Sequence, residues 1–326
     1  MPILSVSEIE RLSVAALERH GAEPAIAAEM ARAVAWAEAR GNRICGLYYL
    51  ESYCLQLESG RVNGTARPVV NRARASEIRV DADAGFAQTA FAQALPAGLE
   101  AARETGMASV ALYNAHTCTA LGYFTEAAAK AGMLAFGLTN ASPIVAPPGG
   151  KTRVIGTNPI SFAVPDGQGG VAMLFDQSTT TVALGKITMA KAAGETIPEG
   201  WAIDADGNAT TDPEAALGGS LTSSGGYKGW GLGLMAEILA SCLGGGRLSR
   251  DIKPLKAPEG EPHQIGQYFI LIDPSESSGF HERLSQLAAF VGEDEGCRMP
   301  GRGRQPEDSV EVPQAVQDQL LALAGQ

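Results

Sequence analysis

The segments MASVALYN (107–114), GYFTEAAAKAG (122–132) and MLAFGLTN (133–140) decide the fold class of this chain. The first and third are apolar runs with the length of a buried strand, and the second has the apolar spacing of a helix that ends at a glycine. Further apolar runs are PISFAVP (159–165), VAMLFD (171–176) and QYFILIDP (267–274). Strands that alternate with a helix in this way predict an α/β layer structure, in which helices cover a sheet.

The residues before this layer predict helices. Three segments have helical apolar spacing and stop at glycines: 9–17 before Gly21, 24–40 before Gly41 and 47–57 before Gly60. After a strand over 77–81, the segment 86–104 predicts another helix, which Pro96 should kink. The turn-rich stretch 197–213 predicts a solvent hairpin and not a calcium loop, because Ala215 stands where the bidentate glutamate belongs.

The composition excludes several classes of protein. With 326 residues, 45% of them hydrophobic, the chain can bury two ordinary cores, and we expect two lobes. A net charge of −11 with scattered acidic residues argues against a nucleic-acid partner, which needs clustered Lys and Arg. The charged first twenty residues predict neither a signal peptide nor a membrane span, so we expect a cytoplasmic protein without a membrane partner. Five cysteines without a CxxC pair and four dispersed histidines predict no disulfide framework and no metal site.

Polar residues at the ends of the apolar strands are the first candidates for a binding site. The glycine-rich stretches GWGLG (229–233) and GGGRLSR (244–250) fit neither the Rossmann fingerprint nor a P-loop. Ligands of α/β proteins collect where strands end. The polar residues at these ends are Asn114, His116, Asn140, Ser142, Thr157, Asn158 and Asp176. Lys228 opens a helix beside free backbone N–H groups, which favours a phosphate contact, although turn and capping roles stay open for each residue.

Six motifs then occur in an order that resembles a known family. They are GTNPISFAVP (156–165), FDQSTTTVALGKI (175–187), IPEGWAIDADGNATTDP (197–213), GGYKGWGLGLMAEIL (225–239), IGQYFILIDP (265–274) and RMPG (298–301). Together they resemble the malate/L-lactate dehydrogenase family, whose nicotinamide cofactor is held without a Rossmann fold. The similarity covers nearly the whole chain.

The resemblance implies an NAD(P)H-dependent reductase of small 2-oxo or cyclic 2-imino acids, usually a homodimer. It implies a non-Rossmann α/β cofactor domain over 76–250, packed on a mainly helical domain that residues 1–75 form with a returning C-terminal segment, 251–326. The implied cofactor residues are Asp176, Gln177, Ser178, Tyr227, Lys228, Met299, Pro300, Gly301 and Arg302. The residues expected to face the substrate are Tyr49, Tyr53, Thr117, Thr157, Leu184 and Gly185.

The turn RGNRICGLYYL (40–50) departs from the family pattern. The family usually has S-H-G-x-x-R here, in which the serine orients a histidine proton donor and the arginine binds the substrate carboxylate. Those places hold Ile44, Cys45 and Tyr49 in this chain. Where the family commonly has N-S-x-H-F-G, the chain reads NAHTCT (114–119), so Thr117 replaces a second histidine and His116 lies one residue earlier.

The missing histidine favours an imine substrate over a ketone. Reduction of a ketone leaves an alkoxide that needs a proton donor with a pKa near neutrality, whereas a cyclic imine binds already protonated and leaves a neutral amine. Cys45, with a reference pKa of about 8.5, acts as a donor only if its pKa is tuned. Otherwise it is a small apolar wall, which suits a pyrroline ring. His116 is the other candidate for a proton donor.

We therefore predict reduction of Δ1-pyrroline-2-carboxylate to L-proline, or of Δ1-piperideine-2-carboxylate. Asp176 then stabilises the iminium, unless its carboxylate only caps the helix that follows. The alternatives are a malate- or lactate-type 2-hydroxy acid dehydrogenase, and a catalytically impaired relative that only binds the cofactor.

Two binding roles stay open in the sequence. With Tyr49 at the arginine position, the substrate carboxylate can be bound by Arg43 or by the hydroxyls of Thr117, Thr119 and Thr157. Arg302 and Arg304 favour NADPH over NADH if they bind a 2′-phosphate, although both arginines can equally face solvent.

Overall fold

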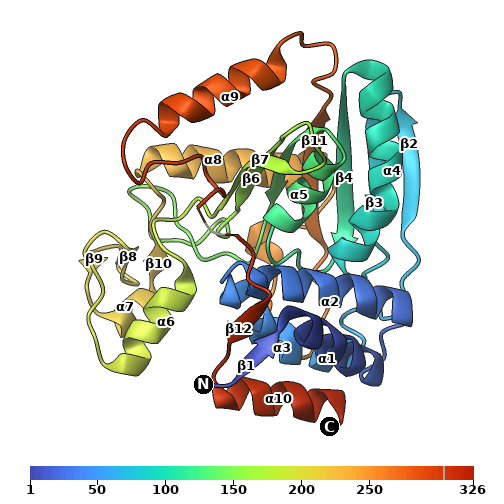
Figure 1. The fold of residues 1–326 in the computed structure, drawn as a ribbon. Coiled ribbons are helices and arrows are strands. Elements are labelled where there is room, and N and C mark those ends of the chain that lie inside the picture. Colours follow the sequence, from blue (N-terminus) through green and yellow to red (C-terminus); the bar gives the residue numbers. More distant parts are fainter. Residues whose placement is uncertain (304) are drawn as a thin grey trace.

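A helical layer forms one half of the molecule in the computed structural model, which describes residues 1–303 and 305–326. Its helices are α1 (Val6–Arg19), α2 (Pro24–Ala39), α3 (Leu50–Glu58) and α10 (Gln314–Ala324). The short strands β1 (Ile3–Ser5) and β12 (Ser309–Glu311) pair antiparallel and bring the two ends of the chain together. Figure 1 shows this layer below the sheet, with both termini beside α10. The helices expected before Gly21, Gly41 and Gly60 are all present.

The layer is held by one apolar core to which both ends of the chain contribute. Leu12 of α1, Met30 of α2 and Leu50 of α3 are fully buried in it, together with Val310 and Leu320 from the C-terminal end. Because burial of apolar surface is the main favourable term in folding, α10 is an integral part of the first lobe and not a terminal appendage.

A seven-stranded mixed sheet forms the other half. Its strands lie in the order β2 (Val69–Arg74), β3 (Glu77–Asp81), β4 (Met107–Ala115), β11 (Ile265–Ile272), β5 (Leu134–Thr139), β6 (Ile160–Pro165) and β7 (Val171–Gln177). Only the β3–β4 pair is parallel. The predicted α/β fold class is confirmed, and the strand β2 was not predicted because its residues are polar and mostly exposed.

Helices cover both faces of this sheet. Phe269 of β11 packs with α4 (Ala87–Thr105) and α5 (Gly122–Lys130), whereas its neighbour Tyr268 packs with α8 (Tyr227–Glu237) and the π-helical turn Ile238–Leu243 that continues it. Successive side chains of a strand point to opposite faces, so α8 lies opposite α4 and α5. Pro96 lies inside α4, which continues past it.

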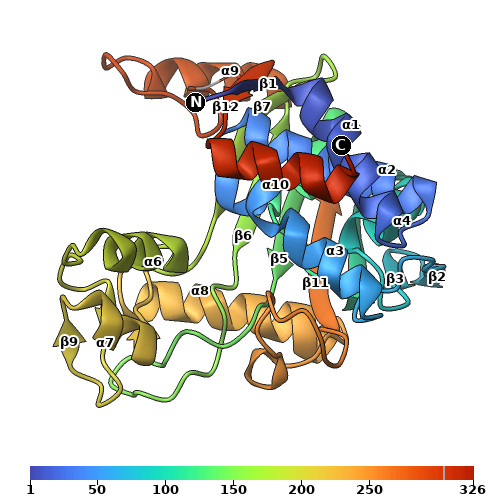
Figure 2. The ribbon, with the colours of Figure 1, turned by 90° about the horizontal axis from the view of Figure 1, so that it is seen from below.

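A small lobe projects from the sheet (Figure 2). It contains α6 (Leu184–Ala193), α7 (Pro213–Gly218) and a three-stranded sheet of β8 (Ala202–Ile203), β9 (Ala209–Thr210) and β10 (Ser220–Leu221). The antiparallel β8–β9 pair confirms the hairpin predicted within 197–213.

The C-terminal quarter of the chain divides its contacts between the two halves. Strand β11 lies in the middle of the main sheet, between β4 and β5, and α9 (Phe280–Val291) follows it. Only β12 and α10 lie in the helical layer. The domain bounds 1–75, 76–250 and 251–326 stay a prediction, and a boundary at 251 would separate β11 from its neighbours. Within the described residues, no helix is long and apolar enough to cross a membrane.

Candidate active site

A cavity of about 810 Å³ lies at the edge of the main sheet, against β7. Five of the residues predicted to hold the cofactor line it: Asp176, Gln177, Met299, Pro300 and Gly301. The backbone explains why two distant segments meet here, because the N–H of Leu174 in β7 donates to the carbonyl of Pro300 (3.0 Å). The cavity walls also include Arg40, from the C-terminal end of α2, and Arg298.

Asp176 is the acidic group of the cavity. It lies near the end of β7, and its Oδ2 accepts a hydrogen bond from the N–H of Gly122, the first residue of α5 (2.7 Å). Burial raises the pKa of Asp176 to about 6, although the Gly122 N–H favours the ionised form. The carboxyl therefore titrates close to the pH at which most enzymes work.

The alternative role of Asp176, as a cap for the helix that follows it in the chain, is wrong. The next helix, α6, begins eight residues later at Leu184, and its N-cap is Ala183. The carboxylate bonds to α5 instead, because β7 and α5 pack side by side.

The thiol of the Cys45 turn is electrostatically coupled to the same carboxylate. Burial raises the pKa of Cys45 to about 12, and the negative charge of Asp176 raises it further. A thiol with this pKa is neutral at pH 7. The turn is supported from below, since the buried Glu38 of α2 accepts the N–H of Leu47 through Oε1 (2.8 Å).

Aromatic rings extend the wall behind Cys45. The ring of Tyr49 stacks on that of the buried Tyr53 at 5.9 Å between centroids. Burial and the neighbouring Cys45 raise the pKa of Tyr49 to about 12, so its hydroxyl is neutral. The ammonium of Lys256 lies 3.2 Å from the Tyr48 ring centroid and 5.2 Å from that of Tyr49. Position 49 thus has a cation nearby although it is not itself an arginine.

His116 lies deeper than Cys45. Its ring is 1% exposed, and its Nδ1 is 2.8 Å from Nδ1 of His263. Burial lowers the pKa of His116 well below its usual value, and His263 and Arg61 lower it further. A hydrogen bond between two Nδ1 atoms requires one donor and one acceptor, which two neutral rings of opposite tautomer supply. A proton-donating role for His116 stays a prediction, and its neutral state at pH 7 does not favour it.

The other predicted substrate residues surround the turn or support it. Leu184 and Gly185 begin α6, and a side chain at Gly185 would run into Cδ1 of Ile44 (2.9 Å). Thr117 is buried and its hydroxyl accepts the N–H of Thr119 (3.4 Å). The carbonyl of Thr157 accepts both the N–H and the hydroxyl of Thr179 (2.9 Å each).

The remaining cofactor candidates lie on segments next to β7 or to the residues that follow it. The N–H of Ser224 donates to the carbonyl of Thr179 (2.9 Å), so the segment after Ser178 runs beside the loop that leads into α8. Tyr227 and Lys228 at the start of that helix are exposed. Arg302 donates from Nε to the carbonyl of Ala172 on β7 (3.2 Å). Arg304 lies outside the described residues.

Sequence reasoning missed four residues of this region. Arg40 and Glu38 read as ordinary positions of an amphipathic helix, and Gly122 as the start of another. Cys118 is buried, and this burial raises the pKa of its thiol, with further rises from Asp176 and Cys45. These four residues can be recognised only from the packing of their segments in three dimensions. Their local sequences look like those of an ordinary helix or turn.

The mixed sheet has a cofactor-sized cavity at its edge, and the wall of this cavity contains a carboxyl group of raised pKa. This combination is typical of an enzyme that acts on small molecules. No group of three His, Cys, Asp or Glu side chains in the described ranges is arranged to hold a metal ion.

Comparison with known proteins gives the family. The model of the malate/L-lactate dehydrogenase family matches residues 4–312. A (2R)-3-sulfolactate dehydrogenase (NADP(+)) of Chromohalobacter salexigens is 40% identical over 99% of this chain and 98% of its own. A Δ1-pyrroline-2-carboxylate/Δ1-piperideine-2-carboxylate reductase of Pseudomonas putida is 36% identical over 95% and 92%. The crystal structure of the Δ1-piperideine-2-carboxylate reductase of Pseudomonas syringae superposes with a TM-score of 0.87 at 32% identity, covering 99% of this chain and all of the other.

The chain belongs to the malate/L-lactate dehydrogenase family, and the predicted enzyme class, an NAD(P)-dependent oxidoreductase, is confirmed. The residues present fit such a cofactor. The cavity volume lies within the range of about 300–1,000 Å³ that cofactor sites have, and two arginines stand in its walls.

Proposed function

We propose that this enzyme reduces a small cyclic 2-imino acid, with Δ1-pyrroline-2-carboxylate and Δ1-piperideine-2-carboxylate as the favoured substrates. The observation that carries the proposal is the set of titratable groups around Cys45. The thiol has a pKa of about 12 and His116 is buried and neutral, so neither donates a proton readily near pH 7. A substrate that arrives protonated on nitrogen does not need such a donor.

Asp176 is the residue that we expect to recognise the iminium. NADPH, when bound, supplies a hydride to the carbon of the substrate. Above pH 6 the Asp176 carboxylate is ionised, and a fixed negative charge in a water-poor wall stabilises a cationic ring. Cys45 and Tyr49 give that ring a largely apolar wall, which fits a pyrroline better than a chain with a second acidic group.

Reduction of a 2-oxo acid is the second candidate. Two observations favour it: a 40% identical relative is a sulfolactate dehydrogenase, and a carboxyl with a pKa of about 6 is a competent proton donor below that pH. In this alternative Asp176 protonates the substrate oxygen and must begin in its neutral form.

A substrate panel separates the two candidates. We expect NADPH oxidation with Δ1-pyrroline-2-carboxylate and Δ1-piperideine-2-carboxylate to be at least about tenfold faster in kcat/KM than with pyruvate, oxaloacetate or sulfopyruvate, which is about 1.4 kcal/mol of barrier. Rates on any of the three oxo acids that equal those on the imines would reject the imine proposal. Cofactor binding without turnover on any of them would identify an impaired relative.

Replacing Cys45 by alanine is expected to leave imine turnover within about tenfold of wild type, since the neutral thiol acts as a wall. The measurement is kcat/KM with each imine at pH 7.5. A loss of several orders of magnitude would instead make the thiol a proton donor. Cys54→Ala, in the helical core away from the cavity, controls for the loss of a buried sulfur.

For the cofactor we propose NADPH over NADH, with the contacts supplied by the residues from Asp176 to Ser178, by Tyr227 and Lys228, and by Met299 to Arg302. Lys228 lies at the exposed start of α8, where its own charge and the helix dipole favour a phosphate. The sulfolactate dehydrogenase relative carries NADP(+) in its name.

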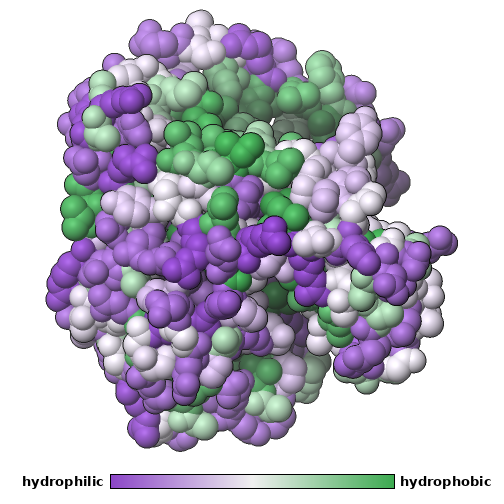
Figure 3. Space-filling model, turned by 180° about the vertical axis from the view of Figure 1, so that it is seen from behind, coloured by the Kyte–Doolittle hydropathy of each residue, from purple (hydrophilic) through white to green (hydrophobic). Residues whose placement is uncertain are grey.

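We also propose a homodimer, formed through the outer face of α8. Figure 3, which views the molecule from behind, shows apolar side chains gathered in its upper half. Exposed apolar side chains of this helix and its π-helical extension include Leu232, Ile238 and Leu243, and exposed patches of this kind favour protein contacts. We expect light scattering after size exclusion to give about 68 kDa, twice the chain mass of 33.8 kDa. A mass of one chain at micromolar concentration would refute this. A cytoplasmic location stays a prediction.

A further inference from the structure

Arg40 is a cation in the cavity wall to which no role has been assigned. It is the residue that follows α2, and it lines the cavity together with Asp176 and Met299. Its side chain is 23% exposed. Burial lowers the pKa of Arg40 but leaves an arginine charged at pH 7. A half-buried cation that lines a ligand cavity needs anionic groups nearby to compensate its charge.

Neighbouring side chains hold the Arg40 guanidinium in place. Its Nη2 donates to Oε1 of the buried Glu126 on α5 (2.8 Å), and its carbon lies 4.2 Å from the centre of the Trp36 ring. The Trp36 indole N–H donates to the other oxygen of Glu126. A guanidinium fixed on both sides loses little entropy when it binds a ligand, which is what a recognition site requires.

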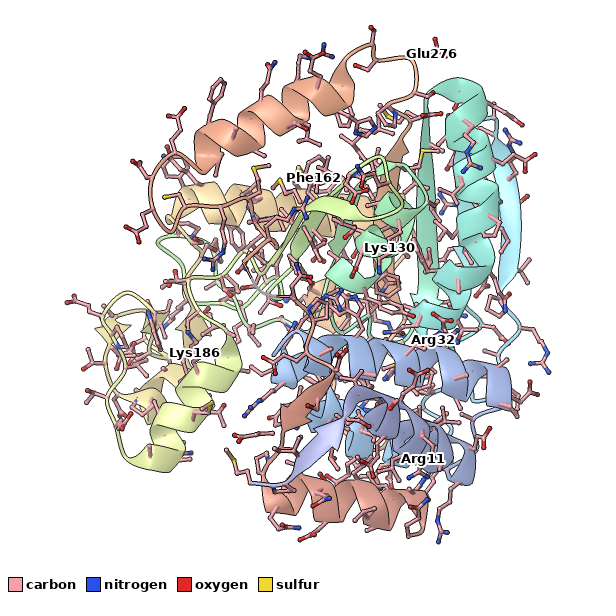
Figure 4. The ribbon with its side chains drawn as sticks, in the orientation of Figure 1. Arg11, Arg32, Lys130, Phe162, Lys186 and Glu276 are labelled. Carbon is pink, nitrogen blue, oxygen red and sulfur yellow. The ribbon has the colours of Figure 1, made fainter. Side chains whose placement is uncertain are left out.

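Arg40 shares its carboxylate partner with a second cation. Glu126 also pairs with Lys130 (2.9 Å), so one carboxylate serves two cations. Figure 4 shows Lys130 on α5, above α2. In the described part of the chain, the only other hydrogen bond of the Arg40 side chain is a long one from Nη1 to the carbonyl of Trp36 (3.5 Å). The guanidinium has five N–H donors, so donors remain for a ligand.

Other cations near the site are less suited to the same task. Arg302 uses its Nε on the backbone of β7. The ammonium of Lys256 lies on the Tyr48 ring in a loop outside the cavity walls. Arg43 is exposed and donates to the carbonyl of Glu311 (3.2 Å). Arg298, the other arginine of the cavity wall, is exposed. Of these cations, Arg40 is the one that is both held by neighbouring side chains and part of the wall of the cavity that contains Asp176.

We propose that Arg40 binds the anionic group of the ligand that fills this cavity, with carboxylate or phosphate oxygens as its acceptors. The planar guanidinium matches both groups, because two parallel N–H bonds reach two oxygens. The anion comes either from the substrate carboxylate or from a phosphate of the cofactor. This inference rests on the proposed function only through the ligand class, because 2-imino and 2-oxo acids carry the same carboxylate and use the same cofactor.

Direct binding measurements test the assignment. Calorimetric titrations with NADPH, with NADH, and with pyrrole-2-carboxylate in the presence of saturating NADP⁺ are compared for wild type, Arg40→Met and Arg40→Lys. We expect Arg40→Met to weaken at least one ligand about 30-fold, as for a lost charged hydrogen bond, and Arg40→Lys to recover part of it. Loss with pyrrole-2-carboxylate alone assigns the substrate carboxylate. Equal loss with NADPH and NADH assigns the pyrophosphate, and loss with NADPH alone assigns the 2′-phosphate.

Two further variants make the result decisive. Arg32→Met is the matched control, since Arg32 lies on the same helix, is 51% exposed and pairs with Glu29; Figure 4 labels it on α2. It should bind all three ligands as wild type does. The proposal is overturned if Arg40→Met also binds all three within threefold of wild type, or if Lys256→Met weakens binding while Arg40→Met does not. If Arg40→Met does not fold, Arg40→Lys decides, because a point charge cannot replace a bidentate contact in full.

Discussion

Asp176→Asn is expected to lower kcat/KM for Δ1-pyrroline-2-carboxylate by at least about 100-fold, or about 2.7 kcal/mol of barrier. Asparagine keeps the size of the side chain and an oxygen for the Gly122 N–H, but it removes the negative charge that we expect to face the iminium. A preorganised charge in a water-poor site is worth this much in comparable enzymes.

The dependence of kcat/KM on pH shows which ionisation state of Asp176 is the active one. If the ionised carboxylate is the active form, kcat/KM of the wild type falls as the pH drops below about 6, the pKa of Asp176, and Asp176→Asn lacks that inflection. If Asp176 is a proton donor to an oxo acid, activity falls instead as the pH rises above 6. A profile of the second kind would replace the imine proposal by the oxo-acid candidate.

We expect Asp176→Asn to stabilise the fold although it lowers activity. A carboxyl whose pKa is raised in the folded state stabilises the fold below its unfolded pKa, near 3.8, and that contribution is lost as the pH rises through about 6. Asp176→Asn should therefore unfold at a higher temperature than wild type at pH 8, and the difference should shrink toward pH 4.

A neutralised carboxylate elsewhere controls for the Asp176 variant. Asp204 lies in the β8–β9 hairpin, where it accepts the N–H groups of Asp206 and Asn208, and Asp204→Asn should keep wild-type kcat/KM. If Asp176→Asn also stays within threefold of wild type, the carboxylate only anchors Gly122.

Gly46→Ala is expected to cost about 1–3 kcal/mol of unfolding free energy, as overpacking does, and to raise the KM for the imine about tenfold. A side chain at Gly46 would overlap the carboxyl group of Glu38. Glu38 is 3% exposed and can move only by breaking its bond to the Leu47 N–H. The turn that carries Cys45 must then shift. Chemical denaturation and steady-state kinetics measure the two effects.

Gly218→Ala is the matched substitution. Gly218 ends α7 in the small lobe and has open space around its Cα, so alanine there should leave stability and KM nearly unchanged. If Gly46→Ala and Gly218→Ala have the same stability and the same KM, the Glu38 side chain moves aside without cost and does not fix the turn.

The fold could be predicted well where the local pattern agrees with the tertiary environment. The segments 107–114, 122–132 and 133–140 have clear strand or helix periods, and they form β4, α5 and β5 within two residues. The strand β2 was not predicted, because an edge strand with exposed polar residues lacks a buried face. The position of β11 in the middle of the sheet could not be predicted, because strand order depends on pairing between segments that are distant in sequence.

The sequence by itself determined the α/β class and the family, because periodicity and motif order are properties of the linear chain; the cofactor contacts from Asp176 to Ser178 and from Met299 to Arg302 stay a prediction. Only the tertiary structure decided that Asp176 accepts the N–H of Gly122 at the start of α5 instead of capping the helix that follows it in the chain, that His116 is buried against His263, and that Arg40 lines the cavity. The physical reason is that burial and charge pairing, which set these pKa values and roles, arise from side chains that are tens of residues apart in sequence.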